Sequence, residues 1–288
     1  MKKRLALIIS VFILFIVACS RHEDKNAIHV MTFNIRYDNT EDSTFAWKNR
    51  AGQVCNFLTN EKPDIIGMQE VLRSQYEILD SALTYYSSVG VGRDDGIKAG
   101  EMNPIFYRKD RFELVRTITF WLSDTPEVPG SKGWGSSLPR IVTWAELVDE
   151  NSKKHFFCFN THFAHDSESA RILSSKMLLK EVEKISAGFP FIITGDFNIL
   201  PNSQSYKILT GPDESVPLFK DSYLISEKKP SGPSGTFNGF DDKTRNGRID
   251  YVFVRNGMKV IDHKTIINKE HGVYISDHWP VQATVLLK

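Results

Sequence analysis

A carboxylate and an amide follow a short apolar segment in the C-terminal half of the sequence. Residues 191–194 read Phe-Ile-Ile-Thr, a composition typical of a buried strand, and Gly195 then allows a tight turn. Asp196 and Asn198 lie two positions apart, so in extended backbone their side chains point the same way. A carboxylate can take a proton from water, and an amide can orient that water or a phosphate oxygen. The same residues would also suit a plain turn that closes the strand.

Other polar residues occur at the same kind of position, at the border of an apolar run. They are Asn34, Glu70, His162, Asp250, Asp277 and His278. In layered α/β folds, strand ends of one orientation gather at one sheet edge, so we expect these side chains to converge. The oxygen-rich set suits Mg²⁺ or Mn²⁺, since the thiolates or paired helical histidines of a zinc site are missing. Glu70 is the best ligand candidate, with Asn34 and Asp277 beside it, and Asp196 and the imidazoles would handle protons.

The elements that must position these residues begin with an alternation of strands and helices. We predict strands over 28–37 and 64–71 and helices over 47–60 and 74–85, an order that favours parallel pairing in an α/β layer. Further along, the pattern predicts a capped helix over 166–186 and a loop-rich stretch over 211–247. The remaining predicted strands cover 87–92, 104–108, 112–122, 140–148, 154–162, 249–255, 259–267 and 279–287.

The N-terminus differs in composition from the rest of the 288-residue chain. Residues 1–19 combine a basic start with an apolar run that is short for a membrane span, and they end at Cys19 in Ile-Val-Ala-Cys. This segment predicts a signal peptide and resembles a bacterial lipobox, so we expect export and a lipid anchor on Cys19 at the cell envelope, at the outer membrane or the surface. An uncleaved anchor helix and simple secretion are the alternatives. Residues 20–27 then form a tether, and 28–288 form one domain.

The charge balance bears on the substrate. Removal of residues 1–18 takes away three positive charges and changes the formal net charge from +1 to −2. Proteins that grip long nucleic acids usually carry a basic surplus, so a small phosphorylated substrate is favoured and nucleic acid remains an alternative. We expect a monomer. Cys55 and Cys158 lie in apolar surroundings, and we expect both to be free thiols.

Six short motifs resemble, in order, those of the endonuclease/exonuclease/phosphatase superfamily. They are Thr32-Phe33-Asn34, Gln69-Glu70-Val71, Asn160-Thr161-His162, Gly195-Asp196-Phe197-Asn198, Arg248-Ile249-Asp250-Tyr251 and Ser276-Asp277-His278-Trp279-Pro280. The resemblance spans about residues 28–288. It implies a four-layer α/β sandwich in which two mixed β-sheets pack face to face between helices, as in deoxyribonuclease I. It also implies a metal-dependent phosphoester hydrolase.

The resemblance also implies a role for each residue of these motifs. Glu70 would be the principal metal ligand, with Asn34 and Asp277 nearby. Asp196 would position or deprotonate the attacking water, and Asn198 would orient the water or the phosphate. The remaining family-like groups are His278 supported by Asp250 at the phosphorus centre, His162 as the second histidine, and Glu101 as its partner.

Three stretches depart from the general superfamily pattern and look like the mark of a bacterial subgroup of exported hydrolases. They are residues 91–96, 120–126 and 133–135. Our hypothesis is that these loops wall the pocket, with Arg93 or Arg140 binding a phosphate and Trp121 or Trp134 stacking on a sugar or base. The alternative for Trp121, and for Trp144, is an ordinary place in the core.

Several residues admit a plainer interpretation. We interpret His29, His155 and His263 as structural, and His165 and His271 stay open. Arg171 could reach the site, but pairing with Glu168 or Glu181 on its own helix is favoured. For the whole chain, the predicted activity is Mg²⁺-dependent hydrolysis of a small phosphodiester or phosphomonoester. An extracellular nuclease is the alternative within enzymes, and a lipid-anchored binding protein without turnover is the alternative outside them.

Overall fold

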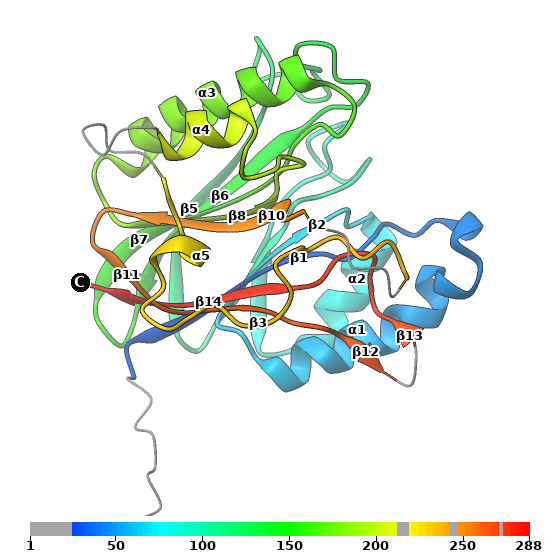
Figure 1. The fold of residues 1–288 in the computed structure, drawn as a ribbon, viewed down its shortest axis with the longest axis horizontal. Coiled ribbons are helices and arrows are strands. Elements are labelled where there is room, and N and C mark those ends of the chain that lie inside the picture. Colours follow the sequence, from blue (N-terminus) through cyan, green and yellow to red (C-terminus); the bar gives the residue numbers. More distant parts are fainter. Residues whose placement is uncertain (1–24, 212–218, 242–246, 271–272) are drawn as a thin grey trace, which may run out of the picture.

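The computed structural model describes residues 25–211, 219–241, 247–270 and 273–288 (Figure 1). The predicted signal peptide with Cys19, most of the tether, and His271 lie outside the described residues. The remainder forms four layers, in which two β-sheets pack face to face and helices cover the outer side of each (Figure 1). The predicted sandwich is confirmed.

The first sheet has the strand order β11-β14-β1-β2-β4-β3. In it β1 runs parallel to β2, and its other neighbour, β14, runs antiparallel, so the sheet is mixed. Its strands are β1 (Ala27–Asn34), β2 (Ile65–Gln69), β3 (Tyr86–Val89), β4 (Ile105–Arg108), β11 (Met258–Thr265) and β14 (Val281–Leu287).

The second sheet has the strand order β5-β6-β7-β8-β10-β9. Here β7 and β8 are parallel and every other pairing is antiparallel. Its strands are β5 (Phe112–Trp121), β6 (Ile141–Asp149), β7 (Lys154–His162), β8 (Phe191–Asp196), β9 (Lys220–Asp221) and β10 (Asp250–Arg255). A small hairpin of β12 (Lys269–Glu270) and β13 (Val273–Tyr274) stands apart from both sheets.

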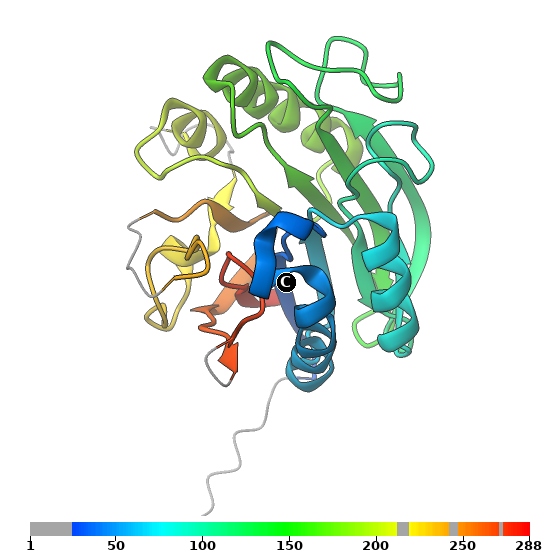
Figure 2. The same ribbon diagram turned by 90° about the vertical axis from the view of Figure 1, so that its right-hand side faces the viewer.

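The outer layers are two pairs of helices (Figures 1 and 2). Helices α1 (Trp47–Glu61) and α2 (Arg73–Ala82) pack on the first sheet, and α3 (Glu168–Ser186) and α4 (Gln204–Thr210) pack on the second. The hydroxyl of Ser167 caps α3 by accepting from the backbone N–H of Ala170 at 3.1 Å, so the capped helix predicted over 166–186 is present. A 3₁₀ helix (Thr40–Phe45) precedes α1.

Side chains alternate along the strands, so that one set packs in the core between the two sheets and the other in the core between a sheet and its helices. In β7, Phe156 and Cys158 face the other sheet, while Phe157 and Phe159 face the helices. Strands β8 and β10 follow the same rule, since their even-numbered residues face the other sheet. The even-numbered residues at one end of these strands are polar, and the fold thereby directs His162, Asp196 and Asp250 into the space between the sheets.

A buried polar band lies beneath this end of the sandwich. Gln69 donates to Asn160 Oδ1 at 2.7 Å and to Thr32 Oγ1 at 3.1 Å, and Thr194 donates to Asn160 Oδ1 at 3.1 Å. Gly67 makes this close approach possible, because a Cβ at that position would stand 2.0 Å from Thr194 Oγ1. The two sheets are therefore joined by hydrogen bonds directly below the candidate site.

The predicted elements are mostly present, with differences at the ends and in the loops. Strand β2 covers Ile65–Gln69 and is shorter than the strand predicted over 64–71, so Glu70 lies just beyond its end. The stretch 211–247 contains the short elements β9 and α5 (Ser222–Ile225), and α4 was not predicted. Cys55 and Cys158 are free thiols, as predicted. Among the described residues, no helix combines the length and the apolar character that a membrane crossing requires.

Candidate active site

The predicted site residues gather around one cavity of about 490 Å³ at the polar end of the sandwich. Seven of the nine predicted residues line it: Glu70, Glu101, His162, Asp196, Asn198, Asp277 and His278. The other two, Asn34 and Asp250, lie directly behind and hydrogen-bond to residues of the lining. The convergence predicted from the strand ends is therefore present in the fold.

Asp196 ends β8 at the centre of the cavity. It faces Asp250 across the antiparallel pair β8–β10 and His162 across the parallel pair β7–β8. Asn34 donates to Asp196 Oδ2 at 3.0 Å, and both oxygens are buried. Burial and the neighbouring charge of Asp250 raise the pKa of Asp196 to about 7. A carboxylate with this pKa can accept and release a proton near neutral pH.

Asn198 lies in a turn beyond the end of β8, which is the alternative that the sequence left open for these residues. Its φ of 51° places it in the left-handed region, and its backbone N–H donates to Asp196 Oδ1 at 3.0 Å. The side chains of Asp196 and Asn198 are thus set by a turn and not by the two-residue repeat of a strand. The turn still brings Asn198 to the cavity, where its Nδ2 donates to His162 Nε2 and to the carbonyl of Phe163, both at 3.1 Å.

His278 is held by a carboxylate on one ring nitrogen and faces the cavity with the other. Its Nδ1 donates to Asp250 Oδ2 at 2.9 Å, and its Nε2 lies 3.7 Å from Asp196 Oδ2. Burial alone would lower the pKa of His278, but Asp250 and Asp196 outweigh it and raise the pKa well above the usual range. The imidazole is therefore a cation with a fixed orientation.

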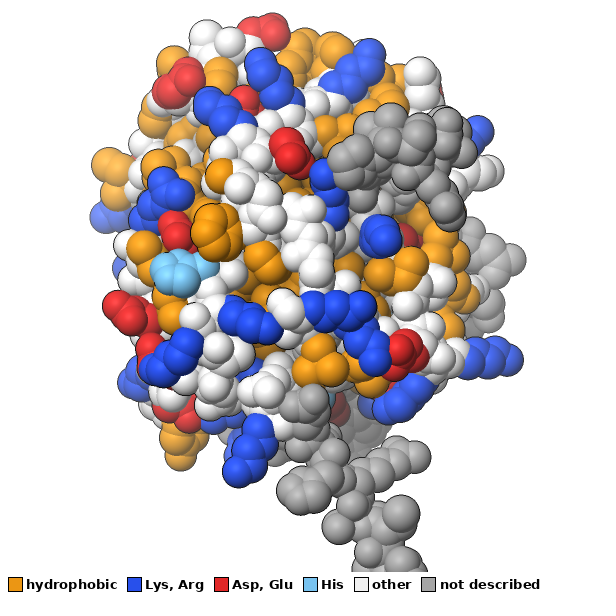
Figure 3. Space-filling model, turned by 90° about the vertical axis from the view of Figure 1, so that its left-hand side faces the viewer, with side chains coloured by type: hydrophobic (Ala, Val, Ile, Leu, Met, Phe, Trp, Pro, Cys, Tyr) orange, Lys and Arg blue, Asp and Glu red, His pale blue; other side chains and the backbone are white. Residues whose placement is uncertain are grey.

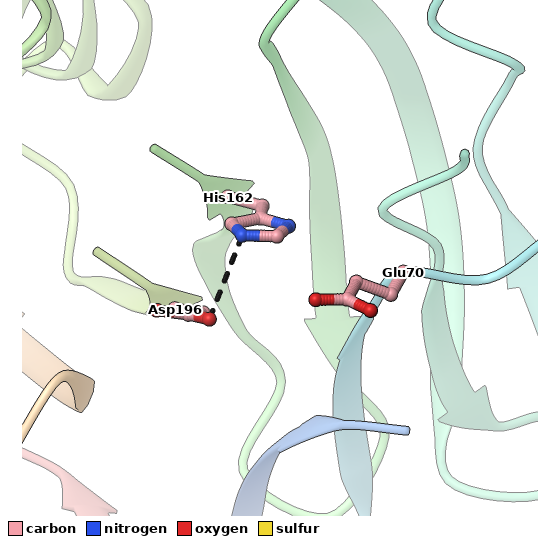
Figure 4. A group of neighbouring side chains, drawn as sticks. All are labelled: Glu70, His162 and Asp196. Atoms are coloured by element: carbon pink, nitrogen blue, oxygen red, sulfur yellow. Dashed lines mark ion pairs between the residues drawn. The ribbon is translucent and has the colours of Figure 1, made fainter. Parts of the chain in front are cut away.

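Glu70 approaches the cavity from the first sheet, opposite His162 and Asp196 of the second (Figure 4). Its φ of 61° is a left-handed conformation, which residues other than glycine rarely adopt and which often occurs at functional sites. Asn34 Nδ2 donates to Glu70 Oε1 at 2.9 Å, and the backbone N–H of Tyr37 donates to Oε2 at 3.1 Å.

Asp277 lies near Glu70 at the edge of the cavity. Burial and the charge of Glu70 raise the pKa of Asp277, although His278 opposes the shift. Arg36 Nε lies 4.0 Å from Asp277 Oδ2. The backbone N–H of Arg36 also donates to Asn34 Oδ1 at 2.9 Å, so the Asn34 amide turns its nitrogen toward the carboxylates.

His162 carries its proton on Nδ1. Its Nε2 accepts from the Asn198 amide, and neutral imidazole has one protonated nitrogen. Burial and the positive charges of Arg140 and Arg93 lower the pKa of His162 well below the usual range. Nδ1 is buried and has no hydrogen-bond partner in the part of the chain that the structure describes, and Glu101 Oε2 is 3.9 Å away. Glu101 instead accepts from Arg93 Nη1 at 2.8 Å, which holds it just outside hydrogen-bond distance of the imidazole.

The hypothesis that the subgroup loops wall the pocket is wrong, since no residue of 91–96, 120–126 or 133–135 lines the cavity. Arg140 lines the cavity, but Arg93 lies behind Glu101 and is not part of the lining. Trp121 is buried and donates to the backbone carbonyl of Arg93, and Trp134 donates to Asp124 outside the cavity. The core interpretation is correct for Trp121 and Trp144.

Other residues of the lining carried little signal in the sequence. They are Arg36, Tyr37, Leu138, His165, Phe237 and Ile249. The ring of Phe237 packs edge-on against His278, with 5.1 Å between the ring centroids. His29, His155 and His263 do not line the cavity, in agreement with a structural interpretation. Arg171 donates to the carbonyls of Ala164 and His165, which differs from both predicted partners.

The donor set fits a divalent hard cation. Glu70, His162 and Asp196 each offer a ligand atom, and these atoms lie within 4.8 Å of one another (Figure 4). Asp196, Asp250 and His278 form a second such group. Burial is the main cause of the raised pKa values of Asp196 and Asp277, and the neighbouring carboxylates Asp250 and Glu70 add to it. Carboxylate oxygens are the ligands that Mg²⁺ and Mn²⁺ prefer.

Known proteins resemble the chain in both sequence and fold. The model of the Endonuclease/Exonuclease/phosphatase family matches residues 31–278. An uncharacterized protein of Acanthamoeba polyphaga mimivirus is 30% identical over 255 residues, which are 83% of this chain and 92% of the relative.

Two solved structures from Bacteroides species share nearly the whole fold. An endonuclease/exonuclease/phosphatase of Bacteroides vulgatus is 37% identical, with a TM-score of 0.86 over 92% of this chain and 100% of that one. A mannosyl-6-phosphatase of Bacteroides thetaiotaomicron is 34% identical, with a TM-score of 0.84 over 90% of this chain and 99% of that one.

Proposed function

The chain belongs to the endonuclease/exonuclease/phosphatase family, and we propose that it is a divalent-metal-dependent hydrolase of small phosphomonoesters. The cavity carries this proposal. Its volume of about 490 Å³ suits a small molecule. Its lining combines proton-handling groups with Arg140, a buried cation whose Nε and Nη1 have no hydrogen-bond partner among the described residues. A terminal phosphate would satisfy both N–H groups.

The distribution of charge favours a small substrate over a long polymer. Without residues 1–18 the formal net charge is −2, whereas binding of nucleic acid gains most from a basic surface. Figure 3 shows the side of the molecule that lies away from the cavity, and there Lys and Arg side chains are interspersed with Asp, Glu and uncharged side chains. The structural relative named as a mannosyl-6-phosphatase supports a phosphorylated sugar as the substrate.

Asp196 is the group that we assign to the attacking water. Its pKa of about 7 lets it take a proton from water as the oxygen attacks phosphorus, and Asn34 holds Oδ2 in place at 3.0 Å. Asn198 is fixed by the turn beside it and would orient the water or a phosphate oxygen. In-line attack forms the new P–O bond as the bond to the leaving oxygen breaks.

His278 would stabilise the negative charge that grows on the phosphoryl oxygens. Asp250 keeps the imidazole protonated and orients its Nε2–H toward the cavity, where it needs no rearrangement during the reaction. His162, which is neutral, presents Nε2 to Asn198 and would act as a positioning group.

Glu70 is the residue we expect to hold Mg²⁺ or Mn²⁺, with Asn34 and Asp277 beside it. His162 and Asp196 are further candidates by proximity. When bound, the cation would offset the negative charge of the phosphate. Asn34 would have to give up the bond from the Arg36 N–H to Oδ1 before it could ligate through that oxygen.

We further propose that the protein is exported and lipidated on Cys19, for which the N-terminal sequence is the support. The tether would join β1 at Ala27, and Asn34 of the active site is at the other end of that strand. A lipidated protein would therefore hold the cavity away from the membrane. Metabolic labelling with a fatty acid, compared between the wild type and Cys19→Ala, tests this proposal.

The activity is tested by hydrolysis of p-nitrophenyl phosphate, mannose 6-phosphate, bis-p-nitrophenyl phosphate and single-stranded DNA. We expect turnover of the two monoesters to require Mg²⁺ or Mn²⁺, to stop with a chelator and to exceed turnover of the diester and of DNA. His155→Gln should keep the turnover of the wild type, because His155 is exposed and does not line the cavity. Turnover that survives chelation would contradict the proposed metal dependence. Faster cleavage of the diester or DNA would contradict the proposed substrate.

A further inference from the structure

His165 is an exposed histidine that lines the active-site cavity. It lies on the segment between β7 and α3, three residues after His162. A positive charge on His165 would lower the pKa of His162, so the two imidazoles belong to the same site. Because His165 is exposed and His162 is buried, His165 occupies the mouth of the cavity and His162 its interior.

The backbone at His165 is held in place from two directions. Arg171 Nη1 donates to the carbonyl of Ala164 at 2.9 Å and to that of His165 at 3.0 Å. On the other side, Asp166 Oδ2 accepts from the backbone N–H of Ser137 at 3.0 Å, which joins this segment to the loop before β6. Because its guanidinium donates to these backbone carbonyls, Arg171 does not pair with the carboxylates on its own helix that the sequence predicted.

The side chain of His165 is fixed as well. Arg140 Nη2 lies 3.0 Å from His165 Nδ1, and because a guanidinium can only donate, Nδ1 must accept. The neutral ring therefore carries its proton on Nε2. Exposed side chains ordinarily keep their rotational freedom, and fixing one has an entropic cost. A side chain that is already fixed at the mouth of a cavity is organised in advance for binding.

We propose that His165 is a specificity-determining residue that donates from Nε2 to a hydroxyl oxygen on the leaving group of the substrate. This inference rests on the proposed function and adds the residue that recognises the hydroxyl groups of a sugar leaving group. Arg140 takes part in the recognition of both the phosphate and the leaving group. Its free Nε and Nη1 are available to the phosphate, and its Nη2 orients His165. The part of the substrate beyond the phosphate then passes the imidazole on its way to solvent.

The test compares mannose 6-phosphate, which offers hydroxyl oxygens, with p-nitrophenyl phosphate, which offers none. For His165→Ala we expect kcat/KM on mannose 6-phosphate to fall about tenfold more than on p-nitrophenyl phosphate, the equivalent of one hydrogen bond. His165→Gln can place an amide N–H near the position of Nε2 and should recover most of this difference. His155→Ala removes another exposed histidine and should leave the ratio of the two kcat/KM values as in the wild type.

The two proposals fail in different ways. Equal losses on both substrates in His165→Ala, or no loss on either, would overturn the role of His165 while leaving the hydrolase intact. A wild type that turns over p-nitrophenyl phosphate but not mannose 6-phosphate would overturn the inferred leaving group. A folded wild type with divalent metal that turns over neither would contradict the proposed function itself. Circular dichroism and the melting temperature of each variant establish that it is folded.

Discussion

Two buried polar clusters in the second sheet differ in how their charges are balanced. In the first, which we call the Asp221 cluster (Tyr206, Asp221 and Arg248), one carboxylate meets one guanidinium. Arg248 Nη1 donates to Asp221 Oδ1 at 2.7 Å and to Oδ2 at 2.5 Å, and the hydroxyl of Tyr206 donates to Oδ2 at 2.7 Å. Every charge in this cluster has a direct partner.

The active-site cluster has an excess of negative charge and several unsatisfied atoms. Asp196 and Asp250 are directly opposite each other on adjacent strands, and Glu70 and Asp277 lie nearby. Within the described ranges, Asp250 Oδ1 and His162 Nδ1 are buried and have no hydrogen-bond partner. A buried group left unsatisfied costs about 1–3 kcal/mol. The comparison teaches that buried charge alone does not mark a functional site, whereas buried charge without a matching partner around a cavity does.

Asp196→Asn is the strongest test of this difference between the two clusters. We expect kcat to fall roughly 10³- to 10⁴-fold, because the amide cannot take a proton from water. The stability of the metal-free protein should be retained or increase by up to about 1 kcal/mol, because the repulsion from Asp250 disappears. Steady-state kinetics and urea unfolding measure the two effects. A variant that is both active and less stable would place Asp196 with the structural carboxylates.

Asp221→Asn is the matching change in the Asp221 cluster. It leaves the buried guanidinium of Arg248 without its counter-charge, so we expect the free energy of unfolding to fall by about 3 kcal/mol or more. The folded fraction should keep a kcat close to that of the wild type, since no residue of this cluster lines the active-site cavity. Urea unfolding and kinetics at low temperature provide the measurements. A large loss of kcat with normal stability would remove the distinction between the clusters.

His263 adds a pH-dependent effect beside the Asp221 cluster. It is fully buried, Ser222 lies 2.8 Å from its Nδ1, and burial lowers its pKa to about 4. Its ordinary pKa is about 6.5, so between pH 6.5 and 4 the unfolded state binds the proton and the folded state does not. Stability is therefore lost as the pH falls through this window, by up to about 3 kcal/mol.

The contribution of His263 can be separated from the titration of the active site. Urea unfolding of wild type and His263→Gln is compared at several pH values from 7 to 4, and the difference between the two proteins is followed. We expect the wild type to lose more stability than the variant as the pH falls. Parallel curves for the two proteins would show that His263 does not titrate in this window.

The contrast between the clusters also explains what the sequence could and could not predict. Asp196, His162 and Asp250 were predictable because each follows or begins an apolar strand, and strand ends at one edge of a sheet converge. The layers were predictable from the alternation of strands and helices. Arg248 belongs to one of the six motifs, but the motif does not predict its partner. Its pairing with Asp221 joins β9 to the segment before β10, and no local sequence pattern encodes such a contact.

Residues of the cavity that come from loops were the hardest to predict. Phe237 and Leu138 lie in segments rich in Gly, Pro and Ser, where periodicity gives no side-chain direction. At Asn198 the sequence allowed both an extended strand and a turn, and only the structure shows the turn, with a φ of 51° and a hydrogen bond from the Asn198 N–H to Asp196. Trp121 could not be placed from its type alone, since a large aromatic suits a core and a binding surface equally well.

The smallest effect is expected at Glu101, which belongs to both kinds of arrangement. It is paired with Arg93 at 2.8 Å, as in a structural cluster, and lies 3.9 Å from His162 Nδ1, as in the active site. Glu101→Gln keeps the shape and removes the charge. We expect the free energy of unfolding to fall by about 1 kcal/mol through the lost ion pair. We also expect kcat to fall by only about threefold to tenfold, because the 3.9 Å between Glu101 and His162 Nδ1 is too long for a hydrogen bond.

Kinetics separates the two roles of Glu101. Catalytic hydrogen bonds are often long without substrate and shorten when it binds, so a partner of His162 should lower kcat while KM stays nearly constant. A residue that only pairs with Arg93 should change the unfolding curve and leave kcat as it is. A loss of kcat beyond about 100-fold would place Glu101 among the groups on which the reaction depends. Glu101 would then belong to the active-site cluster, even though it forms an ion pair with Arg93.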